Sequence, residues 1–271
     1  MQGGGMEIVM EYLIIILVCF FSSVVGAICG IGGGVIIKPV LDAVGIMAVT
    51  TVSFLSGCTV LSMSVVSLYK NLRKRADFPF DKVFATVLAL GSVVGGLTGK
   101  ELYQSVIEHL SDSSRVGAVQ AGILTLITLG TLIYTVFKKK IPTKNIRNKA
   151  VIFIIGIVLG MMSSFLGIGG GPINLVVLFY FFSMETKQAA LNSIYVIMFS
   201  QISSLLSTLL KGNTPPFEPQ ILLLMIGCGV FGGLAGSRIN RQIRSEAVDK
   251  LFMGLMGVII CISVYNIFRY L

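Results

Sequence analysis

The feature that most constrains the fold of this chain is a series of long apolar segments with few or no charges. The clearest of them cover residues 8–27, 84–97, 116–137, 151–165 and 251–268. Several approach the roughly 20 apolar residues that a helix needs to cross a bilayer. Hydrophobic residues make up 55% of the chain and charged residues only 12%, about half the charged share of a typical soluble domain. Lipid must therefore cover much of this apolar surface, because one soluble core of this length cannot bury it.

The apolar segments predict helices rather than barrel strands. They are rich in Leu, Ile, Met and Phe and lack the short period-2 alternation of membrane strands. We expect an all-α polytopic membrane protein of the inner (cytoplasmic) cell membrane. The five cysteines lie in hydrophobic segments without paired spacing, and His109 is the only histidine, so the sequence predicts no metal site and no cofactor. The net charge of +9 comes from basic loops, which concern orientation and anionic lipid rather than nucleic acid.

An internal repeat divides the chain into two halves. The pentapeptide GIGGG at residues 30–34 recurs at residues 167–171, an offset of 137. The same offset relates two further pairs, Phe80-Asp81 with Phe217-Glu218 and GGLxG at 95–99 with GGLxG at 232–236. Three anchors in one register predict two membrane repeats, residues 1–140 and residues 141–271.

Each half contains the same succession of predicted helices. The ranges are 8–28, 35–46, 48–69, 80–99 and 116–137 in the first half, and 150–166, 172–183, 187–210, 218–237 and 248–268 in the second. The segment that follows each glycine run is too short to span a bilayer alone. We therefore expect half-helices or re-entrant elements at these two places.

Loop charges predict that the two halves are inverted. The loops at residues 70–75, 138–149 and 238–244 are basic, whereas residues 101–114, the counterpart of 238–244, are mainly acidic. The positive-inside rule assigns the three basic loops to the cytoplasm and both termini to the outside. Equivalent loops then face opposite sides of the membrane, so the repeats have inverted topology, as in many secondary transporters.

These motifs resemble the sulfite exporter TauE/SafE family. The resemblance rests on the paired GIGGG runs, each with a proline close behind (Pro39 and Pro172), and on the later GGLxG helix of each half, so it covers nearly the whole chain. It implies a permease for sulfite, organosulfonates or other small anions. The halves are not identical, since Lys38 aligns with Leu175, so we expect chemically unequal half-sites.

The glycine runs are the main candidates for a substrate site. A run of glycines before a helix start lets the backbone approach a ligand closely and directs free N–H groups and the positive end of the helix dipole toward it. A small oxyanion is suited to such a place. We therefore expect the substrate anion between Gly32, Gly33 and Gly34 on one side and Gly169, Gly170 and Gly171 on the other. The alternative is close helix packing, which we favour for the GGLxG helices.

Polar residues near the glycine runs are further candidates. Lys38 either complements or gates the anion, or pairs with Asp42 four residues later, or extends toward the interface. Side chains that can donate hydrogen bonds to substrate oxygens are Thr51, Asn174, Asn192 and Ser193. Each of them can instead bridge neighbouring helices.

The sequence thus predicts a secondary transporter of a small anion, sulfite or a short organosulfonate, that works by alternating access. The alternatives are an anion channel or facilitator and a transporter of small carboxylates. An enzyme is disfavoured, because we find no convergent acid/base pair, nucleophile or metal cluster in the pattern. The coupling ion is left open, with a proton as one alternative and Asp42 and Glu185 as its nearest carriers. The oligomeric state is also open, a homodimer being one alternative.

Overall fold

The computed structural model describes residues 3–73, 81–110 and 113–270, and within these ranges every regular element is an α-helix. The ten helices are α1 (Gly3–Cys29), α2 (Gly34–Val44), α3 (Val49–Arg73), α4 (Lys82–Leu110), α5 (Ser113–Phe137), α6 (Lys149–Leu166), α7 (Pro172–Phe182), α8 (Thr186–Leu210), α9 (Pro219–Gln242) and α10 (Ser245–Tyr270). The predicted all-α class is confirmed. Arg75, Phe80 and Asp112, which belong to the loop-charge and repeat patterns, lie outside the described residues.

Eight of the described helices are long and apolar enough to cross a membrane. The exceptions are α2 and α7, which follow the glycine runs and have only 11 residues each. An 11-residue helix is about 16 Å long, roughly half the thickness of the hydrocarbon core of a bilayer. The predicted half-helices are therefore present at both places.

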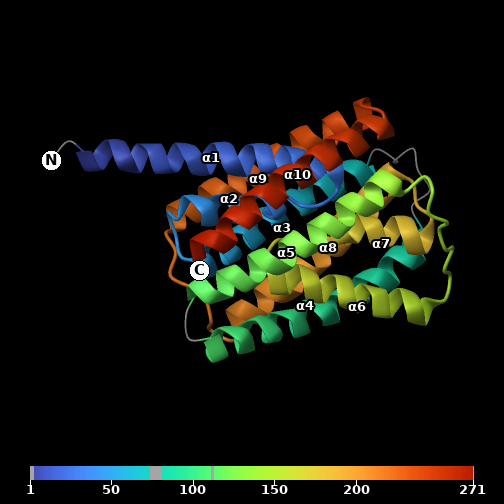
Figure 1. Cartoon of the computed structure of the whole chain (residues 1–271), viewed down its shortest axis with the longest axis horizontal. Coiled ribbons are helices and arrows are strands. Elements are labelled where there is room, and N and C mark those ends of the chain that lie inside the picture. Colours follow the sequence, from blue (N-terminus) through green and yellow to red (C-terminus); the bar gives the residue numbers. More distant parts are fainter. Residues whose placement is uncertain (1–2, 74–80, 111–112, 271) are drawn as a thin grey trace.

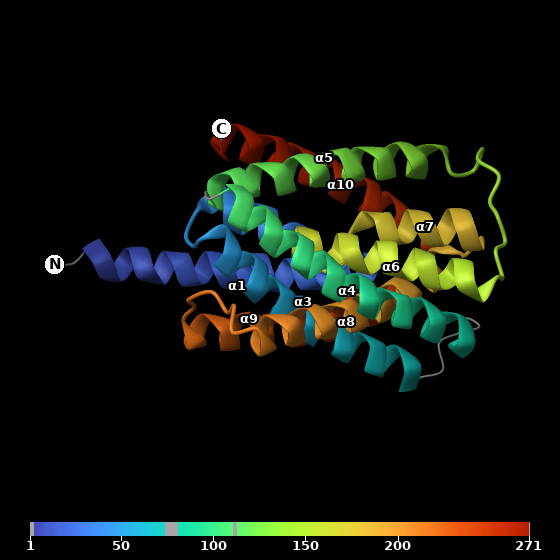
Figure 2. The ribbon, with the colours of Figure 1, turned by 90° about the horizontal axis from the view of Figure 1, so that it is seen from below.

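The two half-helices turn back toward the ends of the bundle from which the chain entered. In Figures 1 and 2, both termini lie toward one end of the bundle and the linker at 138–148 lies at the other. Arg269, near the C-terminus, donates a hydrogen bond of 3.0 Å to the carbonyl oxygen of Asp42 in the last turn of α2. At the other end, the hydroxyl groups of Thr143 in the linker and Ser183 after α7 are 2.7 Å apart. Each glycine run therefore lies at the inner tip of a helix–half-helix hairpin.

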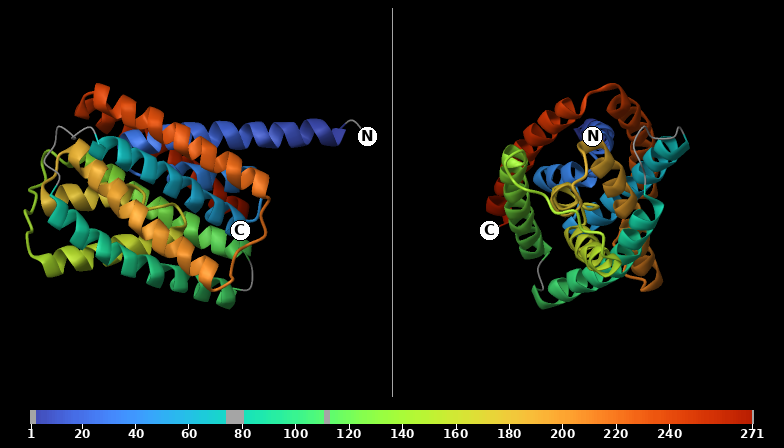
Figure 3. Two further views of the ribbon diagram at one scale, coloured as in Figure 1. Left: turned by 180° about the vertical axis from the view of Figure 1, so that it is seen from behind. Right: turned by 90° about the vertical axis from the view of Figure 1, so that its right-hand side faces the viewer.

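Packing between the halves is reciprocal. Helix α4 packs on α6 as α9 packs on α1, α3 packs on α9 as α8 packs on α4, and α2 contacts α10 as α7 contacts α5. In the end-on view, α5 and α10 lie side by side on one flank (Figure 3). Figure 1 also shows that α1 and α6 run in opposite directions along the bundle. The side of the membrane that each end faces stays a prediction.

Glycines of the GGLxG segments allow close helix crossings, as the packing interpretation predicts. A methyl group at Gly95 or Gly99 of α4 would collide with the backbone of Ile157 or Met161 in α6. The counterparts in α9, Gly232 and Gly236, approach the backbone of α1 in the same way. Small residues at such spacing let two helix backbones approach each other, which is how membrane helices gain packing without a hydrophobic driving force.

The predicted end of the fourth helix is wrong. The sequence predicts a helix end at residue 99 and a loop over residues 101–114, whereas α4 continues to Leu110. Residues 101–110 contain neither glycine nor proline, so nothing in the local sequence ends the helix. The polar extension is also held by tertiary contacts: Tyr103 is buried, and Glu101 forms an ion pair of 2.9 Å with Lys211. Charge alone was therefore a poor marker of the helix end.

Candidate functional site

The two glycine runs meet in the interior of the bundle, and we call this contact between residues 30–34 and 167–171 the glycine crossing. The Gly171 N–H donates a hydrogen bond of 3.3 Å to the carbonyl oxygen of Ile31. A methyl group at Gly32 would lie 3.2 Å from the carbonyl oxygen of Gly169, and one at Gly34 would collide with Ile168. The amino-terminal ends of α2 and α7 therefore approach one another, each beginning beside the other run.

The second glycine run has a backbone conformation that other residues rarely adopt. Residues 169–171 have φ values of 76°, 115° and 69°. Side chains at such positive φ values are strained, so glycine is required here for conformation as well as for space. Pro172 follows at the first turn of α7, where its missing N–H costs no helical hydrogen bond. The first run is more ordinary at its helix start, since Gly33 has φ −66° and ψ −24°.

Asn174 is the polar side chain closest to the second run. It is completely buried in the first turn of α7, and a methyl group at Gly170 would lie 2.6 Å from its Nδ2. Neither Nδ2 nor Oδ1 has a hydrogen-bond partner. A buried amide without partners is costly, and such a group in a native structure calls for an explanation, of which a bound water or ion is one. Asn174 therefore adds a directed side-chain donor to the end of α7.

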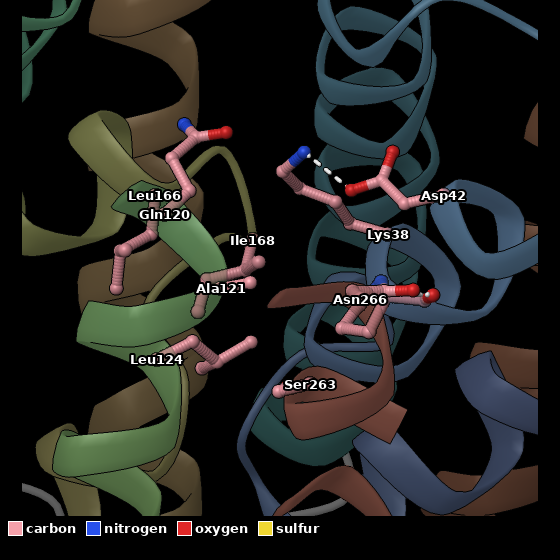
Figure 4. Close-up of a pocket in the computed structure, with 10 residues that line it drawn as sticks. Lys38, Asp42, Gln120, Ala121, Leu124, Leu166, Ile168, Ser263 and Asn266 are labelled. Atoms are coloured by element: carbon pink, nitrogen blue, oxygen red, sulfur yellow. Dashed lines mark hydrogen bonds and ion pairs between the residues drawn. The ribbon is translucent and has the colours of Figure 1, made fainter. Parts of the chain in front are cut away.

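Lys38 and Asp42 form a buried ion pair beside the crossing. Their Nζ and Oδ2 atoms are 2.8 Å apart, and both side chains are almost completely buried. Figure 4 shows this pair on one wall of a small cavity, facing Gln120, Leu166 and Ile168 on the other. The structure thus contains the pairing that the sequence analysis named as one of the alternatives for Lys38. The cavity of about 10 Å³ has room for about one water molecule.

The remaining predicted residues lie on the long helices α3 and α8 and are not all directed to the crossing. Thr51 donates a hydrogen bond of 3.0 Å to the Pro216 carbonyl in the loop between α8 and α9. Asn192 donates to the Gln188 carbonyl one turn earlier in its own helix, at 2.9 Å. Ser193 is completely buried, and its hydroxyl group has no hydrogen-bond partner. Thr51 and Asn192 therefore have structural partners away from the glycine runs.

Comparison with known proteins identifies the family. The model of the family described as "Sulfite exporter TauE/SafE" matches residues 15–263, which include both glycine runs and all ten helices at least in part. The chain belongs to this family. TauE/SafE proteins are membrane transporters, so the chain is a membrane transport protein by family. The resemblance seen in the sequence motifs is confirmed.

Two relatives of this TauE/SafE protein support the same class over nearly their whole length. One is the "Probable membrane transporter protein YunE" of Bacillus subtilis, 22% identical over 290 residues, with 95% of this chain and 98% of the relative covered. A probable membrane transporter protein of Methanocaldococcus jannaschii is 24% identical over 264 residues, with coverage of 90% and 92%. No solved structure matches the chain significantly.

Several polar residues around the crossing of this TauE/SafE protein escaped the sequence analysis as site candidates. A second cavity of about 20 Å³ borders the crossing at Gly167, and its lining includes Ser164, Lys100 and Tyr103. Lys100 was missed because the predicted helix ended at residue 99, which placed this lysine in a loop. Its apolar neighbours on both sides, Leu97 and Tyr103, are the sequence signal that could have kept it inside the helix.

Proposed function

We propose that this protein is a secondary transporter of a small oxyanion, sulfite or a short organosulfonate, which binds at the glycine crossing. The observation that carries this proposal is the meeting of two helix amino-terminal ends inside the bundle, with the Asn174 amide buried beside them. Helix amino-terminal ends provide N–H groups and a positive partial charge, both of which favour an anion. Family membership supports transport as the activity.

A sulfur oxyanion suits this environment better than a cation. The described residues at the crossing provide backbone N–H groups, the Asn174 amide and no carboxylate other than Asp42, whose Oδ2 is already paired with Lys38. A tetrahedral or pyramidal oxyanion presents several acceptor oxygens and can therefore use donors from both half-helices at once. A cation site would require convergent oxygen ligands, and among the described residues no group of three acidic, His or Cys side chains forms one.

The small cavities favour alternating access over an open channel. The cavities on the two sides of the second glycine run measure about 10 and 20 Å³, enough for single water molecules but not for a continuous aqueous pore. Transport by this mechanism requires one repeat to move against the other so that the crossing faces each side in turn. The reciprocal packing of the halves gives two equivalent interfaces on which such a movement can occur.

The carboxylates named for proton coupling differ in placement. Glu185 is exposed at the start of α8, away from the interior. Asp42 is buried next to the crossing, and its Oδ1 has no hydrogen-bond partner. If a proton is the coupling ion, Asp42 is the carboxylate that is placed to carry it.

The proposal is tested by sulfite counterflow in liposomes that contain the purified protein, with Asn174→Leu as the test variant. We expect sulfite exchange in the wild-type protein and its loss in Asn174→Leu, because the variant removes the directed amide while keeping a branched side chain with the same number of heavy atoms. Ile37→Leu is the matched control, since the offset of 137 places Ile37 at the position of Asn174 in the first half. Its apolar side chain is also completely buried.

The control should transport like the wild-type protein. Equal transport by Asn174→Leu and the wild-type protein would contradict the proposal that the substrate binds at the beginning of α7. Absence of exchange for sulfite, thiosulfate, sulfoacetate and taurine in the wild-type protein would remove the sulfur oxyanion as the substrate.

A further inference from the structure

A second polar cavity lies between α3, α4 and α8, next to the glycine crossing. Its inner wall is formed by Gly167 and Ser164, at the start of the second glycine run. Its other walls carry Lys100 and Tyr103 of α4 and Thr208, near the end of α8. The end of α8 lies at the end of the bundle that holds both termini (Figure 3). The cavity therefore lies between this end of the molecule and the crossing.

Lys100 brings a positive charge into this cavity without a matching carboxylate. Within residues 3–73, 81–110 and 113–270, no ion pair includes Lys100. The neighbouring Glu101 is directed to Lys211 instead, at 2.9 Å. Lys100 is partly buried, and its Nζ lies 4.9 Å from the centre of the Tyr103 ring. An unpaired ammonium in such surroundings is costly and attracts an anion.

The rest of the lining consists of groups that can donate hydrogen bonds. The hydroxyl groups of Ser53, Tyr103 and Ser164 are buried in this wall. Those of Ser53 and Tyr103 lie close enough to interact with each other, and that of Ser164 has no hydrogen-bond partner. Gln201 and Ser204 of α8 complete the polar wall, and no residue of the lining has a carboxylate. One cation, three buried hydroxyl groups and no carboxylate together favour a small oxyanion over a cation or a neutral solute.

The cavity beside Lys38 and Asp42 differs from the cavity beside Lys100 in its charge balance. Lys38 is neutralised by Asp42 within its own helix, so an anion that binds Lys38 must compete with the Asp42 carboxylate. Lys100 has no such partner, and its counterpart in the second half, at the offset of 137, is the uncharged Ser237. The cation is therefore a feature of one side of the crossing only.

We propose that Lys100 and the hydroxyl groups of Ser53, Tyr103 and Ser164 bind a small oxyanion in a vestibule between the termini end of the molecule and the glycine crossing. The cavity of about 20 Å³ is smaller than such an anion, and a rotamer change of the flexible Lys100 side chain enlarges it. The role of the vestibule as an access site rests on the proposed transport function. The binding of the anion to Lys100 does not.

The first test measures the sulfite concentration that half-saturates counterflow into liposomes containing the full-length protein. Lys100→Met should raise this concentration about tenfold while the maximal rate is kept, which is the effect of losing one charged hydrogen bond. Lys100→Arg should retain most of the affinity, because it keeps the charge. Lys211→Gln, which removes an exposed cation at the same end of the molecule, is the control and should leave the concentration unchanged.

The second test measures binding without transport. Sulfite should raise the thermal stability of the purified protein above the level in chloride of equal ionic strength, because a ligand that binds only the folded state stabilises it. In Asn174→Leu, where the crossing is altered, the remaining sulfite-dependent increase should disappear on adding Lys100→Met. If the wild-type protein exchanges no oxyanion but this increase depends on Lys100, the transport proposal fails and the vestibule stands. An unchanged half-saturating concentration and an unchanged increase in Lys100→Met would overturn the vestibule.

Discussion

The two half-helices α2 and α7 follow the same pentapeptide but differ in the side chains around it. Helix α2 carries a buried ion pair, Lys38 with Asp42, within its own length. Helix α7 has no charged residue, and its first turn contains the completely buried Asn174, whose amide has no partner. The glycine run before α7 also has three successive positive φ values, whereas Gly33 before α2 is in the right-handed helical region.

This difference shows that the repeat preserves the backbone break and not the side chains around it. The glycines allow two helix ends to approach each other, which is a requirement of both halves. Of the two half-helices, only α2 has charged side chains, which pair with each other. Only α7 has a buried amide without a hydrogen-bond partner. Unequal half-sites were expected from the alignment of Lys38 with Leu175, and the surroundings of the two residues make the inequality concrete.

The largest effect is expected from breaking the ion pair of α2. Lys38→Met leaves the Asp42 carboxylate buried without its partner and should lower the free energy of unfolding by about 3–5 kcal/mol. The double variant Lys38→Met/Asp42→Leu should recover most of this loss, because it makes α2 uncharged like α7. Unfolding in mixed detergent micelles measures both. A double variant that is less stable than Lys38→Met would show that Asp42 stabilises the protein through contacts other than its ion pair with Lys38.

A smaller effect should distinguish the two glycine runs. Gly170→Ala places a side chain at φ 115° and 2.6 Å from both Asn174 Nδ2 and Ile197, so it should cost about 1–3 kcal/mol of unfolding free energy and abolish transport. Gly33→Ala meets its nearest atom, Ser23 Cα, only at 3.1 Å and has an ordinary backbone. It should be the milder change in both measurements. Equal losses of stability and transport in the two variants would mean that the different backbone conformations of the two glycine runs do not affect their tolerance of a side chain.

Two buried asparagines, Asn266 in α10 and Asn174 in α7, should respond differently to removal of the amide. Asn266 of α10 donates a hydrogen bond of 2.8 Å to the Pro39 carbonyl of α2, so Asn266→Leu should cost about 1–3 kcal/mol of unfolding free energy. Asn174→Leu removes an amide that has no partner and should leave stability unchanged or increase it. The same unfolding measurement compares them. A large loss of stability in Asn174→Leu would indicate that its amide has a structural partner.

The smallest effect is expected for the exposed ion pair between Lys211 and Glu101. Both side chains are substantially exposed, at 42% and 59%, and water screens their attraction. Lys211→Gln should therefore change the free energy of unfolding by less than about 1 kcal/mol. Raising the salt concentration should have little influence on the wild-type protein for the same reason. A loss of stability as large as that of Lys38→Met would contradict the view that burial of the pair, and not charge pairing alone, determines the size of the effect.

Much of the architecture could be predicted because a bilayer leaves the backbone few choices. Apolar segments of spanning length must form helices, since unpaired backbone groups cannot be exposed to lipid. The glycine runs and the 11 residues that follow them then mark the half-helices α2 and α7. Where the sequence contained a polar stretch, as at residues 101–110, the same reasoning failed. Tertiary contacts of Tyr103 and Glu101 hold that stretch as helix.

The sequence by itself determined the helical membrane fold, the family and the half-helices, because each of these follows from local hydrophobicity or from a motif that recurs in register. The division into two repeats stays a prediction from the same motifs. Only the tertiary structure decided which polar groups meet. Thr51 donates a hydrogen bond to the Pro216 carbonyl, Gly167 lies against Ser53, and Lys100 and Ser164 line the same cavity. The members of each pair are more than 60 residues apart, so no local sequence pattern predicts that they come together. The packing of whole helices fixes it.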